Sequence, residues 1–317
     1  MPGSSVSMNH LPRVRGRYAE NAPLGEVGWF RAGGRAEVLF KPEDMDDLAA
    51  FLAGCPAEIP VTVLGVLSNT IVRDGGIRGV VVRLGREFAA IHTDGMLMKT
   101  GAAALDGNAA NAAANAGIAG LEFLSGVPGT IGGALRMNAG AYGAETKDAL
   151  IEAVAVDRQG GIHILTPLEM GMSYRHTDVS EDWIFTHAIF RGVPGRVEEI
   201  KAHIAEIKTK RGTTQPIRER TGGSTFANPS AEELAAAGQK EGLKAWELID
   251  RAGGRGLRRG GAMMSELHCN FMINTGGARA ADLEGLGEEI RRRVRGQSGI
   301  ELRWEIRRIG EALQAGQ

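Results

Sequence analysis

Apolar residues recur near the start of the chain with two different periods, and together these predict a strand–helix–strand unit. Residues 37–40, Glu-Val-Leu-Phe, read as a short strand. Pro42 then opens a helix with acidic residues in its first turn and apolar residues at helical spacing, which ends at Gly54. A second strand, 61–64, breaks at Gly65. We therefore expect the chain to begin with a small α/β unit.

The same patterns continue through the middle of the chain. They predict a strand at 80–84, an alanine-rich helix that Asp106 caps and Gly117 ends, a hairpin of strands 151–156 and 162–165, and a helix over 197–207 with one apolar stripe. These elements extend the mixed α/β organisation to about residue 207.

A change of character at residue 209 indicates a domain boundary. The segment 209–225 is polar, contains Pro216 and has two adjacent glycines, so we place the boundary near Lys210. Beyond it the pattern predicts helices at 243–252 and 280–294, with strands around Phe271 and Trp304. The expected division is a disordered tail at 1–17, two subdomains at 18–85 and 86–209, and a C-terminal domain at 210–317.

Composition narrows the class of protein. At 317 residues the chain is too long for one typical compact core, and 37 Lys and Arg against 38 Asp and Glu argue against nucleic acid or an anionic membrane as the main partner. Two cysteines far apart in sequence form neither a disulfide framework nor a zinc site. With no apolar leader and no run of membrane-spanning length, we expect a soluble cytoplasmic protein without a bound metal.

The segment 126–143 is dense in glycine, and this is the strongest chemical signal in the sequence. Most glycine-rich runs are flexible linkers, but this one also contains Val127, Ile131 and Leu135 and follows an apolar stretch, so we interpret it as a folded loop. Exposed peptide N–H groups in such a loop suit phosphates. A long phosphorylated ligand is the natural inference.

Four further clusters accompany this loop. Residues 64–69 place Gly65, Ser68 and Asn69 where a strand ends; 173–175 read Ser-Tyr-Arg; 221–229 contain Gly-Gly-Ser and Asn-Pro; and 299–306 alternate so that Glu305 points away from the apolar face of a strand. Taken singly, each has a plain alternative: a turn, a solvated arginine, a capping hydroxyl or an exposed carboxylate. Ser224 has no neighbouring base in its motif, which argues against a serine hydrolase.

Taken together and in this order, the clusters closely resemble the UDP-N-acetylenolpyruvoylglucosamine reductase family from about Asn21 to Gly310. The resemblance implies an FAD-binding fold of two α/β subdomains, of the vanillyl-alcohol-oxidase type, followed by an α+β substrate-binding domain. It implies Arg175, Ser224 and Glu305 as catalytic residues. It assigns to the cofactor Gly65, Ser68, Asn69, Gly126, Pro128, Gly129, Gly132, Gly133, Asn138 and Gly140.

The resemblance also implies a reaction of peptidoglycan precursor synthesis. NADPH reduces FAD and leaves, and the enolpyruvyl ether of UDP-N-acetylglucosamine then takes hydride at C3. The arginine and the glutamate would stabilise the negative charge that develops at C2 and its carboxylate, and the serine would deliver the proton. The product would be UDP-N-acetylmuramate, and the flavin would carry the electron chemistry.

Three positions depart from the family pattern. Leu67 stands where a second glycine is expected, Ala227 where many relatives have Lys, and Leu267 where Lys is usual. If position 67 needs a positive φ, a leucine there costs about 1 kcal/mol and weakens flavin binding.

The short spacing from Arg175 to Ser224 is similar to that of the second, shorter type of the family, and we expect a monomer. Two other readings stay open. One is another flavin oxidoreductase of this fold that acts on an alcohol or sugar. The other is a non-catalytic protein that binds a UDP-sugar and never consumes NADPH.

Overall fold

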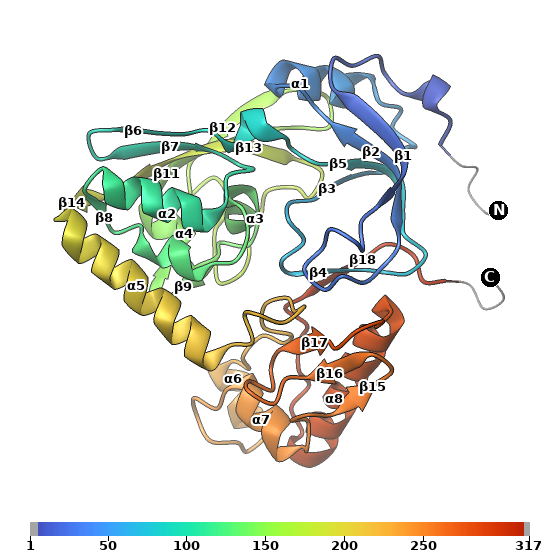
Figure 1. Cartoon of the computed structure of the whole chain (residues 1–317), viewed down its shortest axis with the longest axis vertical. Helices are drawn as coiled ribbons and strands as arrows, with labels where there is room; N and C mark the ends of the chain where they lie inside the picture. Colours follow the sequence, from blue (N-terminus) through green and yellow to red (C-terminus); the bar gives the residue numbers. More distant parts are fainter. Residues whose placement is uncertain (1–5, 314–317) are drawn as a thin grey trace. The chain divides into compact units, whose positions relative to one another are not determined.

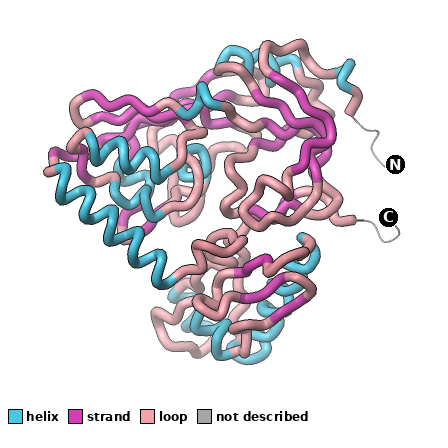
Figure 2. The backbone as a smooth tube through the Cα atoms, viewed as in Figure 1, coloured by secondary structure: helices cyan, strands magenta, loops and turns pink. Residues whose placement is uncertain are grey.

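The computed structural model describes residues 6–313, and the chain divides into two compact units. Within the described residues, unit 1 contains 6–22, 37–66 and 78–211, and unit 2 contains 23–36, 67–77 and 212–313. The chain therefore passes from one unit to the other several times. Figure 1 labels the helices and strands along the chain, and Figure 2 shows which segments are helix, strand or loop.

Unit 1 begins with a four-stranded sheet in the order β1-β2-β5-β3, formed by β1 (Arg17–Pro23), β2 (Arg35–Lys41), β5 (Ile77–Val82) and β3 (Val61–Val63). Helix α1 (Met45–Gly54) lies against this sheet (Figure 1) and buries Leu48, Phe51 and Leu52. It starts after Asp44, whose side chain accepts from the Asp47 N–H at 2.9 Å. Strands β3 and β5 pair in parallel, and α1 connects β2 to β3.

A second sheet of unit 1 is antiparallel, in the order β12-β11-β13-β7-β6. Its strands are β12 (Ile162–Leu165), β11 (Leu150–Val156), β13 (Ile184–Arg191), β7 (Leu97–Gly101) and β6 (Ile91–Asp94). Unit 1 also has three short 3-10 helices, η1 (Met8–His10), η2 (Arg86–Ala89) and η3 (Glu122–Gly126). Its α-helices besides α1 are α2 (Asp106–Asn115), α3 (Ile131–Arg136), α4 (Thr146–Ala149) and α5 (Val197–Thr214). Two short strand pairs complete it: β8 (Ile118–Ala119) with β14 (Val193–Pro194), and β9 (Gly140–Ala141) with β10 (Ala144–Glu145).

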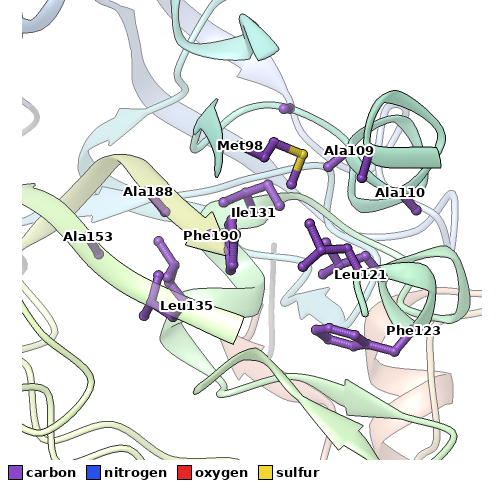
Figure 3. Packing of buried hydrophobic residues seen from close by; sticks show 14 of the residues in the cluster. Met98, Ala109, Ala110, Leu121, Phe123, Ile131, Leu135, Ala153, Ala188 and Phe190 are labelled. Carbon is purple, nitrogen blue, oxygen red and sulfur yellow. The ribbon is translucent and has the colours of Figure 1, made fainter. Parts of the chain in front are cut away.

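The core of this part of unit 1 lies between the second sheet and the helices α2 and α3. Met98 and Phe190 from the sheet pack with Ile131 and Leu135 from α3, and the small side chains of α2 fit beside Leu121 (Figure 3). Alanine on the buried face of α2 lets the helix approach closely. The glycine-rich segment 126–143 is therefore anchored in this core by Ile131 and Leu135.

Unit 2 has a three-stranded antiparallel sheet, β15 (Arg258–Arg259), β16 (Ala262–Met264) and β17 (Met272–Asn274), and a parallel pair, β18 (Arg307–Ile309) with β4 (Thr70–Val72). Its helices are α6 (Ala231–Ala236), α7 (Ala245–Arg251) and α8 (Ala280–Ser298). Leu283, Leu286 and Ile290 of α8 are buried in its core, which also contains Phe30 and Ile71 from distant parts of the chain.

Two local predictions were wrong. Asp106 is the first residue inside α2, and its side chain makes no cap hydrogen bond because Leu105 already holds the N-cap position. Residues 299–306 do not form a regular strand: the segment has a single bridge, from Trp304 to Phe226. Its alternation is still correct, since Ile300, Leu302 and Ile306 are buried.

The expected disordered tail at 1–17 lies partly outside the described residues. In its described part, Met8–His10 forms η1 and Leu11 belongs to the core of the first sheet. Within residues 6–313, no helix combines the length and the apolar character needed to cross a membrane. Both cysteines are buried free thiols.

Candidate active site

The glycine-rich segment of unit 1 is pinned by its own backbone to residues 102–104. The Ile131 N–H donates to Ala104 O at 3.0 Å, and the Gly132 N–H donates to Ala102 O at 2.8 Å. A Cβ at Gly132 would lie 3.1 Å from that same oxygen. Gly132 is thus required by close packing of main chain against main chain, and its N–H is engaged within the protein.

Thr130 stands between two of the predicted cofactor residues. A Cβ added at Gly65 would lie 3.0 Å from Thr130 Oγ1, whereas one at Gly133 would lie 3.8 Å from the same atom. Gly129, which precedes Thr130, has φ +158°. The three glycines leave bare backbone around one hydroxyl, and this arrangement suits a phosphate-bearing cofactor. Sequence reasoning missed Thr130, although a hydroxyl residue inside a glycine-rich turn is itself a signal.

Gly126 and Pro128 precede this turn. Both are half-buried, and a Cβ at Gly126 would lie 2.7 Å from the ring of Tyr142. Gly126 therefore provides space for an aromatic ring of the protein. The role of both residues toward the cofactor stays a prediction.

Asn138 and Arg175 are brought together in unit 1. Asn138 is completely buried, and its Nδ2 donates to Glu145 Oε2 and to Ser173 O, both at 3.0 Å. Arg175 Nη2 donates to Gly140 O at 3.0 Å, and its guanidinium lies 5.2 Å from the centre of the Tyr174 ring. The glycine-rich segment and the predicted catalytic arginine are therefore directly connected.

A second group of predicted residues meets within unit 2, where Asn69 joins two segments. Its side-chain Nδ2 donates to the backbone O of Glu305 at 3.0 Å, and its backbone O accepts from the Arg307 N–H at 3.0 Å. A Cβ at Gly223 would lie 3.4 Å from Asn69 Oδ1. Asn69 thus lies between the Gly-Gly-Ser turn and the segment that carries Glu305.

Backbone hydrogen bonds fix Ser224 beside this segment. The Glu305 N–H donates to Thr225 O at 2.9 Å, and the Thr225 N–H donates to Asn270 O at 2.7 Å. Asn270 also clamps Phe226, since its Oδ1 accepts from the Phe226 N–H at 3.0 Å and its Nδ2 donates to Phe226 O at 2.9 Å. Ser224 and Glu305 are both half-buried.

The remaining loop residues of unit 2 pack closely. Leu67 has φ +56° and is buried, and its O accepts from the Trp29 N–H at 3.4 Å. Ser68 is buried, and a Cβ at Gly222 would lie 3.3 Å from Ser68 O. The left-handed backbone at position 67 is the condition under which we expected leucine to be strained.

Asp106 in unit 1 is an unexpected feature near the glycine-rich segment. Its N–H donates to Gly129 O at 3.2 Å, but its two carboxylate oxygens are buried and make no hydrogen bond within the described structure. Desolvation raises the pKa of this carboxyl well above its usual range. Among residues 6–313, no group of three or more His, Cys, Asp or Glu could hold a metal ion.

Comparison with known proteins agrees with this geometry. Residues 36–166 match the FAD binding domain family, and residues 215–309 match the family of the UDP-N-acetylenolpyruvoylglucosamine reductase C-terminal domain. The UDP-N-acetylenolpyruvoylglucosamine reductase of Parvibaculum lavamentivorans is 57% identical over 313 residues, 99% of this chain and 97% of the relative. The chain belongs to the UDP-N-acetylenolpyruvoylglucosamine reductase family.

Other members of this reductase family support the assignment. The protein of Azorhizobium caulinodans is 58% identical over 300 residues, 95% of this chain and 94% of the relative. The crystal structure of the reductase from Thermus caldophilus is 34% identical and superposes with a TM-score of 0.76, covering 93% of this chain and all of that one. The predicted family and the mixed α/β fold, an FAD-binding part followed by a C-terminal domain, are confirmed.

Proposed function

We propose that this protein reduces UDP-N-acetylglucosamine enolpyruvate to UDP-N-acetylmuramate in peptidoglycan precursor synthesis, using FAD and NADPH. It is a flavin oxidoreductase, a UDP-N-acetylmuramate dehydrogenase, as its relatives along nearly the whole chain are. The observation that carries the proposed chemistry is the pairing of the Ser224 turn with the Glu305 segment, through the Glu305 N–H, Thr225 O and the Asn69 amide.

The residues that would hold FAD in unit 1 are those around the Thr130 hydroxyl: Gly65, Gly129 and Gly133. Their bare backbone fits a pyrophosphate. Ser68 and Asn69, which belong to unit 2, are also proposed to bind the cofactor. When bound, FAD supplies the hydride that originates from NADPH.

Ser224 would give a proton to the substrate carbon next to the carboxylate. A serine that acts as an acid needs no base to activate it, and its motif provides none. The backbone clamp on Thr225 and Phe226 holds the turn, so the hydroxyl can be aimed without a large entropic cost.

Arg175 and Glu305 would act on the carboxylate of the substrate. A guanidinium binds a carboxylate in a fork and stabilises charge that grows on it. Glu305 would contribute as a hydrogen-bonding carboxyl group whose backbone is fixed at both neighbouring peptides.

The test separates the two half-reactions by stopped-flow absorbance of the purified protein with FAD. Ser224→Ala should leave the rate of flavin reduction by NADPH close to that of the wild type and slow reoxidation by UDP-N-acetylglucosamine enolpyruvate by several powers of ten. Ser180→Ala, at an exposed serine of unit 1, is the control. Equal loss of both half-reactions would contradict the role of Ser224, and rapid reoxidation by oxygen alone would indicate a different flavin oxidoreductase.

We further propose that the protein acts as a monomer in the cytoplasm, where NADPH and nucleotide sugars are available. Sedimentation velocity of the FAD-loaded protein at micromolar concentration tests the oligomeric state. A concentration-dependent dimer would contradict it.

A further inference from the structure

The predicted catalytic arginine lies in a tight and strained turn. Ser173 and His176 exchange backbone hydrogen bonds, with the Ser173 N–H donating to His176 O at 3.0 Å and the His176 N–H donating to Ser173 O at 3.1 Å. Tyr174 and Arg175 are therefore the two central residues of the turn. Arg175 has φ +56°, a conformation that a residue with a side chain occupies only when its surroundings hold it there.

The glycine-rich segment holds this turn at two points. Asn138 Nδ2 donates to Ser173 O, the carbonyl at the start of the turn, at 3.0 Å. Two residues further along the segment, Gly140 O accepts from Arg175 Nη2 at 3.0 Å. Both the base of the turn and the guanidinium at its tip are thus tied to residues 138–140.

The neighbours of Asn138 determine which way its amide faces. Glu145 Oε2 can only accept, and it lies 3.0 Å from Nδ2, whereas the Lys147 N–H donates to Oδ1 at 3.0 Å. Asn138 is completely buried, and its backbone φ is +38°, which asparagine tolerates better than most residues. Both N–H donors of the amide are committed to protein acceptors, Glu145 and Ser173.

We infer that Asn138 is a positioning residue that holds the Tyr174–Arg175 turn in the conformation in which Arg175 meets the carboxylate of the substrate. The inference rests on the proposed function, because it gives Arg175 a role only in that reaction. It also assigns the side chain of Asn138 to the turn, so that any contact of this residue with the cofactor is made by its backbone.

A double-mutant cycle tests this inference. The measured quantity is the rate of flavin reoxidation by UDP-N-acetylglucosamine enolpyruvate in the FAD-loaded wild type, Asn138→Gly, Arg175→Ala and the double variant. Glycine is chosen because it removes the amide and accepts a positive φ without strain. We expect Asn138→Gly to slow reoxidation about tenfold or more when Arg175 is present and less than about threefold in the Arg175→Ala background, a coupling typical of residues in one network.

The cycle separates the competing explanations. A loss of folding or of FAD affinity appears in both backgrounds and cancels, so an equal slowing in both would overturn the inference and leave the role of Arg175 intact. If Arg175→Ala alone reoxidises at the rate of the wild type, the proposed role of Arg175 fails, and the positioning role of Asn138 fails with it.

A second pair of variants keeps the inference testable if Asn138→Gly does not fold. Glu145→Gln retains an oxygen that can accept from Asn138 Nδ2, whereas Glu145→Ala removes it. We expect the alanine variant to slow reoxidation more than the glutamine variant, and we expect this difference to vanish in the Arg175→Ala background. A difference that persists there would contradict the relay from Glu145 through Asn138 to the turn.

Discussion

At the scale of single residues, Leu67 combines a cost and a gain. Its φ of +56° costs a leucine about 1 kcal/mol, but its side chain is buried and packs against Gly28. Leu67→Ala and Leu67→Gly both remove the packing, and only glycine also removes the backbone strain. We expect the glycine variant to unfold in urea with a free energy about 1 kcal/mol higher than that of the alanine variant, the reverse of the usual order.

The comparison of these two variants with the wild type tests the consequence for the cofactor. If backbone strain at position 67 weakens flavin binding, Leu67→Gly should have a lower Kd for FAD than Leu67→Ala, as measured by fluorescence titration. An alanine variant that is as stable as the glycine variant would mean that the left-handed conformation imposes no cost at this position.

Asp106 should make stability depend on pH. Burial raises the pKa of its carboxyl in the folded protein, so the folded state is favoured most when the group is protonated. This contribution is complete below the ordinary pKa of about 4 and is lost as the pH rises toward the folded pKa, by up to about 1.4 kcal/mol per pH unit.

The corresponding measurement is urea unfolding of the FAD-free protein at pH 5 and pH 8. Asp106→Asn cannot ionise, so its free energy of unfolding should exceed that of the wild type by a larger margin at pH 8 than at pH 5. Asp94→Asn, at an exposed position on β6, is the control and should show no such change. A margin that is equal at both pH values would indicate that Asp106 finds a partner that stabilises its charge.

At the scale of elements, the first turn of α8 depends on a residue far away in sequence. Asp74 Oδ1 accepts from the Ala280 N–H at 2.8 Å, and Asp74 Oδ2 accepts from the Ala281 N–H at 2.9 Å. A carboxylate at this end of a helix satisfies free N–H groups and interacts favourably with the helix dipole. We expect Asp74→Ala to lower the free energy of unfolding by about 1–2 kcal/mol.

Asp74→Asn is the matched variant, because it keeps one acceptor oxygen and loses the charge. Its effect should be smaller than that of alanine, and hydrogen exchange should increase at Ala280 and Ala281 in both variants. Unchanged exchange at these two amides would show that water replaces the carboxylate at no cost.

The sequence could predict the elements whose signal is local, and it failed where the partner is distant. Periodicity placed α1, α5 and the β11–β12 hairpin, because each repeats its pattern over many residues. The contact of Asp74 with the first turn of α8 could not be predicted from the sequence, since Asp74 precedes Ala280 by 206 positions. The alternation in 299–306 predicted the buried positions correctly. A strand also needs a neighbouring strand that pairs with it over several residues, and in this segment only Trp304 forms a bridge, to Phe226.

The same distinction applies to the site. The motifs that carry Asn69, Ser224 and Glu305 could be identified from sequence. Their contact in unit 2 could not, because it depends on hydrogen bonds between distant segments, from Asn69 to Glu305 and from Glu305 to Thr225. The orientation of the Asn138 amide toward Ser173 could not be predicted, because no local pattern encodes it.

At the scale of the whole molecule, the C-terminal region shares its core with two segments from the N-terminal part of the chain. The matched family covers residues 215–309, but the core of unit 2 also contains Phe30 and Ile71. Strand β18 pairs with β4, and Asn274 Nδ2 donates to Phe30 O at 2.8 Å. Segments 23–36 and 67–77 are therefore structural parts of this unit.

We therefore expect a fragment of residues 212–317 not to unfold cooperatively. Removing a buried phenylalanine and a buried isoleucine costs about 3–5 and 2–5 kcal/mol when each is replaced by alanine, and together this approaches the 5–15 kcal/mol that stabilises a typical domain. Urea titration followed by circular dichroism should give a broad transition for the fragment. A sharp transition would show that the two N-terminal segments only cover a core that is already complete.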